Sequence, residues 1–397
     1  MKQINLDNAA TTKVDENVLQ SMLPYFTEKY GNAASTHYLG EEAKRAVEEA
    51  RVVIAKSIGA RFDEIIFTSG GTESNNLAIK GLYFYLKKNG SNKNHIITTK
   101  IEHDCVLNSC KFLEDNFGVK VTYLDVDGKG FIDITQLDGA INDKTFLVLI
   151  IHGNNEIGTI QNLEEIGKVI KSHKHGSEVA FHTDACQSYT KTKIDVDKMK
   201  LDFVTLNSHK IHGPKGVGAL YVNKKFKNKL EAISSGGGHE YGLRSGTLNV
   251  PGIVGFSKCV SISNSKDVNQ MRELRDYLIK ELLKVEGVKL NGAGIVMEKS
   301  GLFGKRDLRL ANNVNVCIKG VEGEMLGSYL NAKHIYTSTG SACASHHAQE
   351  LSHVLKAIGL GDGEIKNSIR LTLSKYNTKE EIDFVLEEIK RIVGKLR

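Results

Sequence analysis

The chain has 397 residues, of which 40% are hydrophobic and 25% charged, and its formal net charge at pH 7 is +6. This composition is typical of a water-soluble globular protein, and the length favours a large domain with a smaller one. Lysine and arginine are spread along the chain without a basic block, so we expect no direct binding of nucleic acid. The longest apolar runs, such as 146–151, are far shorter than the ~20 residues of a membrane-spanning helix, so we expect no membrane association.

The first residues and the cysteines indicate a compartment. The chain opens on Met1-Lys2-Gln3-Ile4-Asn5-Leu6 and shows no stretch with the pattern of a signal or transit peptide. Its six cysteines include no C-x-x-C pair, which argues against a zinc knuckle or a thioredoxin-like dithiol. Free cysteines fit a reducing environment. We therefore expect a cytoplasmic protein.

Short apolar runs alternate with helical patterns up to residue 222. The predicted strands are 65–68, 95–98, 119–124, 146–151, 179–183, 203–206 and 218–222. Between them lie stretches with apolar residues at helical spacing, for example 162–173. Such alternation predicts a mostly parallel sheet with helices on both faces, where ligands bind at the carboxyl ends of the strands.

The pattern changes after Pro251. The predicted elements are then a helix through Met271 and Leu282, a strand at 314–318, a helix near 322–330, a strand at 369–373 and a final helix through Ile382 and Ile392. The apolar face of the final helix is expected to pack in a core.

Lys210 is the first candidate for catalysis. It stands in Ser208-His209-Lys210, between the strand predicted at 203–206 and a glycine-proline turn at Gly213-Pro214. A partly desolvated amine held at the mouth of a sheet can form a Schiff base with a carbonyl cofactor. The alternative is an ordinary solvated loop lysine.

Asp184 strengthens that interpretation. It ends the strand predicted at 179–183, and Gln187 follows three residues later. A buried carboxylate beside a pyridine nitrogen favours the protonated ring, which is the electron sink of pyridoxal phosphate chemistry. The alternative role of Asp184 is that of a helix cap or turn residue.

A glycine-rich turn provides a candidate phosphate site. Gly70-Gly71-Thr72 lies between the strand at 65–68 and a helix through Leu77 and Leu82. Glycines let the backbone approach a ligand closely, and the N–H groups at a helix start bind anions. The turn is neither a G-x-G-x-x-G nor a Walker loop, which disfavours dinucleotides and nucleoside triphosphates.

Taken in order, these motifs resemble the cysteine desulfurases of the NifS/IscS type, which are fold-type I pyridoxal-phosphate enzymes. The resemblance extends from Leu6-Asp7-Asn8-Ala9-Ala10 to the last helix. Its markers are 68–76, 102–103, 154–158, 184–188, 208–210, 236–240, 244–247, 340–345 and 368–370. It implies an α/β fold with a mostly parallel seven-stranded sheet in a large domain at 14–258, and a smaller α+β domain formed by 1–13 and 259–397.

The resemblance also implies roles around the cofactor, pyridoxal 5′-phosphate. Lys210 would carry it covalently and move protons at the substrate Cα. Asp184 would pair with the pyridine nitrogen, and Gln187 would donate to the phenolic oxygen. His103 would stack on the ring and act as an acid/base, because imidazole titrates near neutral pH.

The phosphate would be held by several small or polar residues. They are Gly71, Thr72, Asn207, Ser208, His209 and, from a neighbouring subunit, Thr247. The family has a serine three residues before the lysine, where this chain has Asn207. The choice between Asn207 and Ser208 therefore stays open.

The substrate and the reacting thiol complete the implied site. Arg370 would clamp the substrate carboxylate with its planar fork of donors, and Asn155 would contact both cofactor and carboxylate. Cys343, in the segment 340–345, would attack the substrate sulfur as a thiolate. L-cysteine would thus give L-alanine and a persulfide on Cys343. A homodimer would pass the sulfur to an iron–sulfur scaffold protein or to a tRNA-thiolation acceptor.

Two other functional classes fit parts of the pattern. One is a related lyase, such as a selenocysteine lyase or a tRNA-dependent cysteine-forming enzyme, although simple elimination needs no protein thiol. The other is a non-catalytic sulfur-carrier subunit, which the intact Lys210 argues against. His346 and His347 could join Cys343 in a metal site, but adjacent histidines rarely point at one ion, and we expect no metal.

Overall fold

The computed structural model of the chain describes residues 3–295, 297–300, 304–339 and 351–397. Its largest element is a seven-stranded sheet in the order β2-β8-β7-β6-β5-β3-β4. The strands are β2 (Ile65–Thr68), β3 (His95–Thr99), β4 (Lys120–Leu124), β5 (Thr145–Leu149), β6 (Ala180–Asp184), β7 (Phe203–Asn207) and β8 (Gly218–Val222). Only β8 runs antiparallel to its neighbours β2 and β7. The predicted mostly parallel sheet is confirmed.

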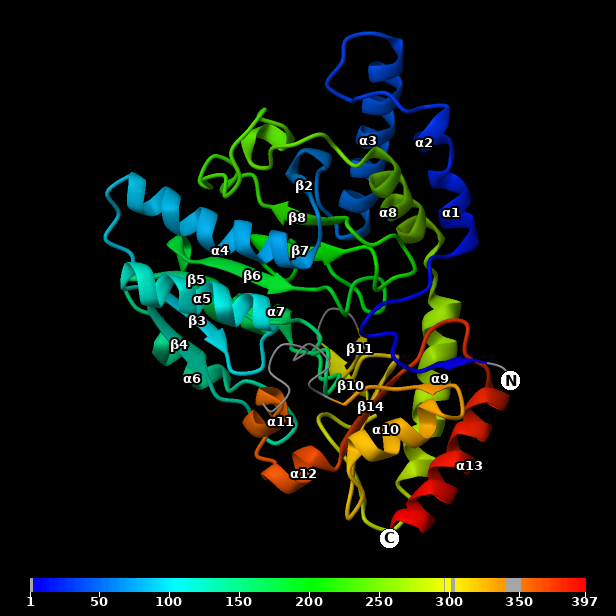
Figure 1. Ribbon diagram of the computed structural model, residues 1–397. Coiled ribbons are helices and arrows are strands. Elements are labelled where there is room, and N and C mark those ends of the chain that lie inside the picture. The colour runs from blue at the N-terminus through cyan, green and yellow to red at the C-terminus, as the bar shows by residue number, and fades with distance from the viewer. Residues whose placement is uncertain (1–2, 296, 301–303, 340–350) are drawn as a thin grey trace.

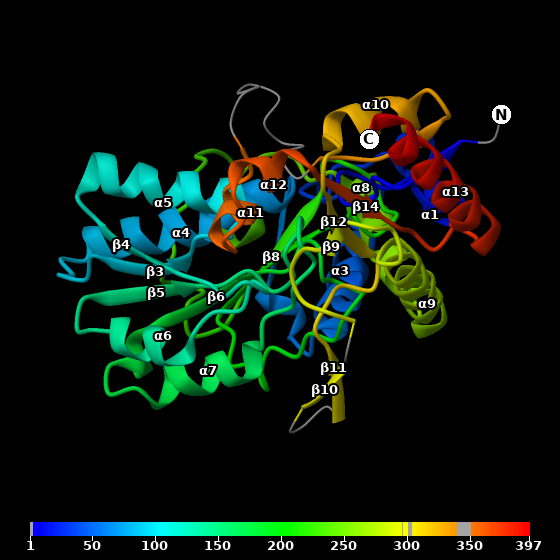
Figure 2. The ribbon, with the colours of Figure 1, turned by 90° about the horizontal axis from the view of Figure 1, so that it is seen from below.

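Helices cover both faces of this sheet (Figure 2). Helices α4 (Gly71–Lys88) and α5 (Asp104–Phe117) lie on one face, and α6 (Ile134–Ala140) and α7 (Leu163–Ser172) lie on the other. Helices α3 (Tyr38–Ser57) and α8 (Val250–Ile262) add to the core of the second face. Ile65 and Phe67 pack on that side while Ile66 packs on the first, as the alternation of side chains along a strand requires. Burial on both faces explains why the strands read as continuous apolar runs.

A second, smaller core forms around an antiparallel three-stranded sheet. Its strands in spatial order are β14 (Ser368–Thr372), β12 (Asn313–Ile318) and β9 (Val288–Leu290). The helices whose side chains join this core are α9 (Ser265–Leu282), α10 (Gly323–Asn331) and α13 (Lys379–Leu396). The face of α13 that carries Ile382 and Ile392 is buried here, as predicted. Figure 1 shows this part of the chain below the large sheet.

The N-terminal segment belongs to the smaller core. Strand β1 (Ile4–Asn5) pairs with β13 (Ile335–Tyr336). Leu6 is fully buried among the residues of the smaller core. The predicted domain boundary at 258/259 falls inside α8, where Cys259 packs in the core of the large sheet. The division of the chain into two domains stays a prediction.

The remaining elements are short. They are α1 (Glu16–Met22), α2 (Pro24–Thr27), the hairpin β10 (Met297–Ser300) and β11 (Gly304–Asp307), α11 (His353–Ala357), α12 (Asp362–Lys366) and short 3₁₀ turns at Phe62–Glu64, Gly176–Glu178 and Glu240–Gly242. Helices α11 and α12 pack against Ile101 and Ile151, which follow strands of the large sheet. Within the described residues, no helix combines the length and apolar character needed to cross a membrane.

Candidate active site

The carboxyl edge of the large sheet carries several of the residues predicted around the cofactor. Asp184 is the last residue of β6, and Asn207 is the last residue of the neighbouring parallel strand β7. Lys210 follows β7 by three residues. Because parallel strands end at the same edge of a sheet, the segments that carry Asp184 and Lys210 leave the sheet at one edge, although the sequence separates them.

The Asp184 carboxylate is buried and accepts two hydrogen bonds. Asn75 Nδ2 donates to Oδ2 at 2.7 Å, and the backbone N–H of Cys186 donates to Oδ1 at 2.9 Å. Asn75 belongs to α4 and is fully buried. The Asp184 side chain is therefore held by two elements besides its own strand.

Helix α4 begins at Gly71 with an open N-terminus. Its N-cap is Gly70, which provides no side-chain hydrogen bond to the first turn. A Cβ added to Gly71 would lie 2.6 Å from Cys186 Sγ, so only glycine fits there without a shift. Thr72 in the first turn is exposed. An uncapped, positively polarised helix start bordered by a hydroxyl fits a phosphate group.

Asn207 and Ser208 point in different directions. Asn207 Nδ2 would lie 3.9 Å from a Cβ on Gly71, and within the described residues Asn207 Oδ1 has no hydrogen-bond partner. The Ser208 hydroxyl is fully buried, 3.9 Å from Cys259 Sγ. The amide thus borders the helix start, and the hydroxyl faces the core.

His103 caps helix α5 at the same edge. Its Nδ1 accepts the backbone N–H of Cys105 at 3.2 Å, and Cys105 Sγ lies 3.2 Å from the same nitrogen. With Nδ1 as acceptor, the hydrogen of the neutral ring is on Nε2. Burial, and then the positive charge of Lys210, lower the pKa of His103. The imidazole is therefore predominantly neutral at neutral pH.

A second lysine supports the backbone of Lys210 from behind. Lys191 Nζ donates to the carbonyls of Gln187 and Lys210, at 3.0 and 3.1 Å. Burial lowers the pKa of Lys191 to about 7. The Gln187 side chain donates to the carbonyl of Ala9 at 3.0 Å. One ammonium thus joins the two segments that carry Gln187 and Lys210.

His209 packs against the N-terminal segment. Its Nδ1 lies 3.2 Å from Thr11 Oγ1, and its backbone carbonyl accepts from the Thr12 hydroxyl at 2.8 Å. Burial, followed by the charge of Lys210, lowers the pKa of His209 to about 4. A neutral imidazole here can donate or accept one hydrogen bond but adds no positive charge.

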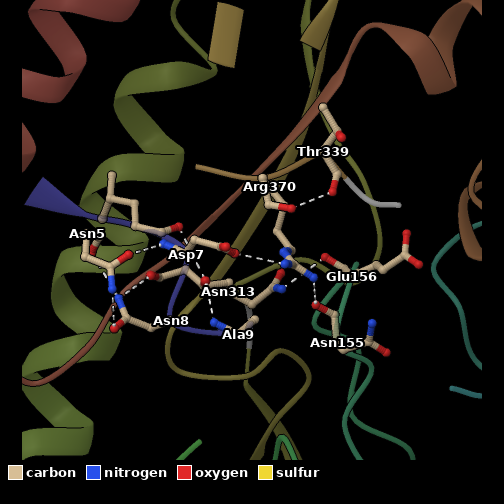
Figure 3. A network of polar contacts seen from close by, with 12 residues as sticks. Asn5, Asp7, Asn8, Ala9, Asn155, Glu156, Asn313, Thr339 and Arg370 are labelled. Carbon is tan, nitrogen blue, oxygen red and sulfur yellow. Dashed lines mark hydrogen bonds and ion pairs between the residues drawn. The ribbon is translucent and has the colours of Figure 1, made fainter. Parts of the chain in front are cut away.

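Arg370 approaches from the smaller sheet (Figure 3). Nη2 contacts Asp7 Oδ1 at 3.0 Å, and Nη1 donates to the backbone carbonyl of Asn155 at 3.0 Å. The Arg370 side chain is almost fully buried, and Nε has no partner in the described part of the chain. Each of these bonds uses one hydrogen of its nitrogen, which leaves donors for an incoming carboxylate.

Two buried carboxyl groups belong to the segments that follow strands β3 and β5. Glu156 Oε2 accepts from Ser352 Oγ at 2.5 Å, and Glu102 Oε1 accepts from Thr99 Oγ1 and from the backbone N–H of Ile151, both at 2.8 Å. Burial raises the pKa of Glu156 to about 7 and the pKa of Glu102 to about 8. Both groups therefore hold their protons more tightly than an exposed glutamate does.

One predicted residue, Thr247, is not assembled with these residues in the single chain. Thr247 is exposed, on the segment between a buried Arg51–Glu240 ion pair and α8. Cys343, His346 and His347 lie outside the described residues. Among the residues that are described, no group of three or more His, Cys, Asp or Glu side chains could hold a metal ion.

Sequence reasoning missed two partners of the predicted residues, Asn75 and Asp7. Each belongs to one of the family motifs, 68–76 and Leu6-Asp7-Asn8-Ala9-Ala10. A fully buried asparagine in a helix is unusual, because amides are mostly exposed. That burial, which the sequence does not show, is the signal that marks Asn75.

The sequence profile of the aminotransferase class-V family matches residues 4–385. Two curated relatives are both named cysteine desulfurase IscS. The protein from Dictyoglomus turgidum is 44% identical, and the alignment covers 100% of this chain and 96% of the relative. The protein from Methanosarcina thermophila is 45% identical, and the alignment covers 100% of this chain and 93% of that relative.

Solved structures give the same picture. A NifS-like protein superposes with a TM-score of 0.88 at 36% identity, covering 99% of this chain and all of its own. A structure described as SspA in complex with cysteine superposes with a TM-score of 0.80 at 38% identity, covering 95% of this chain and all of its own. The similarity extends over both cores.

Proposed function

The chain belongs to the aminotransferase class-V family, and we propose that it is a pyridoxal-5′-phosphate-dependent cysteine desulfurase. The observation that carries the proposal is the meeting of Asp184, Lys210 and the open start of α4 at one sheet edge. The names of its relatives and the cysteine complex of a similar structure support L-cysteine as substrate.

The cofactor fits the residues present. Its phosphate would bind at the α4 start, with Gly71, Thr72 and Asn207, and we infer that Asn207 takes this role in preference to Ser208. Asp184 would hold the ring nitrogen. The remaining contacts that we propose are His103 over the ring, Gln187 at the phenolic oxygen, and His209 and the partner subunit's Thr247 at the phosphate. When bound, the cofactor supplies an electron sink for the substrate Cα.

The protein's own groups would bind and orient the substrate. Arg370 would hold the carboxylate of cysteine with its unused donors, between Asp7 and Asn155. The Lys210 amine would move the proton at Cα, and His103 would hold or give a proton at Nε2. A neutral imidazole suits this task, which agrees with the lowered pKa of His103.

Sulfur transfer would occur at Cys343. The thiolate attacks the sulfur of cysteine, a new S–S bond forms as the substrate C–S bond breaks, and the Cβ carbon takes up a proton. Cys343 and L-cysteine thus become a Cys343 persulfide and L-alanine, with atoms and electrons balanced. The persulfide would pass its terminal sulfur to an acceptor for iron–sulfur assembly or for tRNA thiolation. We propose a cytoplasmic homodimer, which the exposure of Thr247 in the single chain supports.

The test is the release of alanine and sulfide from L-cysteine in the presence of a thiol reductant. We expect activity in the wild type and its loss in Cys343→Ser, with the absorbance of the bound cofactor unchanged. Equal activity in both proteins would reject the role of Cys343 and favour a simple lyase. No activity in either, without cofactor absorbance, would favour a non-catalytic subunit.

A further inference from the structure

Three buried polar side chains form a hydrogen-bonded chain that ends on Asp184. His182 Nε2 lies 3.0 Å from Thr205 Oγ1, Thr205 Oγ1 lies 2.7 Å from Asn75 Oδ1, and Asn75 Nδ2 lies 2.7 Å from Asp184 Oδ2. His182, Thr205 and Asn75 each have 0% of their surface exposed. They come from β6, β7 and α4, so no single element brings them together.

The three hydrogen bonds that link His182 to Asp184 all run in one direction. An ionised carboxylate only accepts, so Asn75 presents its N–H to Asp184 and its carbonyl oxygen to Thr205. The single hydroxyl hydrogen of Thr205 must point to that oxygen. Thr205 Oγ1 therefore accepts from His182, whose ring hydrogen is on Nε2.

The far end of the chain agrees with this assignment. Burial lowers the pKa of His182 to about 3, so the ring is neutral and has one N–H. Its Nδ1 has no hydrogen-bond partner among the described residues, as expected for the bare nitrogen of that tautomer. His182, Thr205 and Asn75 thus each donate one hydrogen bond in the direction of Asp184.

Such a chain has an electrostatic consequence. Hydrogen bonds in a low-dielectric interior polarise one another, so the outer donors strengthen the innermost one. Donors aimed at a carboxylate stabilise its negative charge. The second N–H of Asn75 is directed to Cys105 Sγ at 3.2 Å, which fixes the amide plane.

Binding of the cofactor would use both effects, the stabilised negative charge of Asp184 and the fixed direction of the groups around it. A charged carboxylate that points at a pyridine nitrogen favours the protonated ring. We propose that Asn75 and Thr205 are positioning residues that keep Asp184 charged and oriented toward the ring nitrogen of the cofactor. This inference rests on the proposed function, because it requires a pyridoxal phosphate in the site.

The experiment compares two ligands that differ only in the ring nitrogen. The full-length protein, freed of cofactor, is titrated with pyridoxal phosphate and with its 1-deaza analogue, in which carbon replaces that nitrogen. For Thr205→Val we expect the Kd of pyridoxal phosphate to rise about 10-fold, roughly the loss of one charge-assisted hydrogen bond. The Kd of the deaza analogue should stay within about 2-fold, because it makes no contact that depends on the charge of Asp184.

Two further variants keep the test decisive. Thr205→Ser retains the hydroxyl and should restore the wild-type ratio of the two Kd values. His182→Phe removes only the outermost donor and should raise the ratio about 3-fold, so it serves if Thr205→Val does not fold.

The outcomes separate the two proposals. Equal weakening of both ligands in the Val and Phe variants, or no weakening of either, would overturn the positioning role and leave the proposed function intact. Failure of the wild type to bind pyridoxal phosphate would overturn the proposed function, and this inference with it.

Discussion

Asp184 and Arg370 carry opposite charges of the site, and the protein holds them in different ways. Both oxygens of Asp184 accept hydrogen bonds, from Asn75 and from the backbone of Cys186. Arg370 is equally buried, but its Nε has no partner within the described residues and its two other nitrogens have one contact each.

The difference matches what each group would bind. A cofactor that stays in the site through many turnovers needs a partner whose geometry is already set, and the chain behind Asp184 provides it. A substrate that enters and leaves needs donors that are still available, and Arg370 retains them. Two equally buried charges therefore differ in how much of their bonding capacity the protein itself uses.

Removing the cofactor-side charge should have the largest effect. We expect Asp184→Ala to lower kcat on the order of 10³-fold, because the protonated ring would lose its proposed carboxylate partner. Alanine release at saturating L-cysteine measures it.

A matched control is Asp202→Asn, which changes a buried carboxylate at the opposite end of the sheet. Asp202 pairs with Lys171 and Lys225, far from the strand ends that carry the site. It should alter stability and leave kcat nearly unchanged. A similar loss of kcat in both variants would mean that any buried carboxylate of this sheet matters equally.

Changing Arg370, the proposed substrate-binding residue, should have a smaller effect, mainly on KM. Arg370→Lys keeps the positive charge and loses the planar fork, so we expect KM for L-cysteine to rise on the order of 100-fold, with a lesser change in kcat. Steady-state kinetics of alanine release separate the two constants.

Asp7→Asn tests how Arg370 is oriented. It removes the ion pair and keeps a hydrogen-bond acceptor, so KM should change by about 3-fold at most. If this variant matched Arg370→Lys, the fork would owe its function to Asp7 and the contrast with Asp184 would fail.

The burial of Glu102 should make the free energy of unfolding depend on pH. Because burial raises the pKa of Glu102 to about 8, the folded protein keeps a proton that the unfolded chain releases above about pH 4.5. The free energy of unfolding should therefore fall as the pH rises from about 5 to 8.

Glu102→Gln cannot ionise and should remove part of that slope. We expect the variant to gain about 3 kcal/mol over the wild type between pH 5 and pH 8. Urea unfolding at the two pH values measures the difference. Parallel pH dependence in the two proteins would show that Glu102 does not titrate in this range.

The large sheet, and the edge at which the site lies, could be predicted from the amino-acid sequence. Strands β2 and β8 have the predicted bounds, 65–68 and 218–222. These bounds could be predicted because a run of apolar residues with glycines beside it is a local feature of the sequence. Parallel strands then bring the residues after them to one edge, so Asp184 and Lys210 could be placed together without a structure.

The side chains that hold these groups could not be predicted, because they come from distant parts of the sequence that folding brings together. Asn75 and Asp184 are hydrogen-bonded although 109 positions separate them in the sequence, and Asp7 and Arg370 are in contact although 363 positions separate them. The tertiary structure also turned Asn207 toward the start of α4 and Ser208 toward Cys259. The physical reason is that a hydrogen bond depends on the direction of a side chain to within tens of degrees, and packing between elements sets that direction.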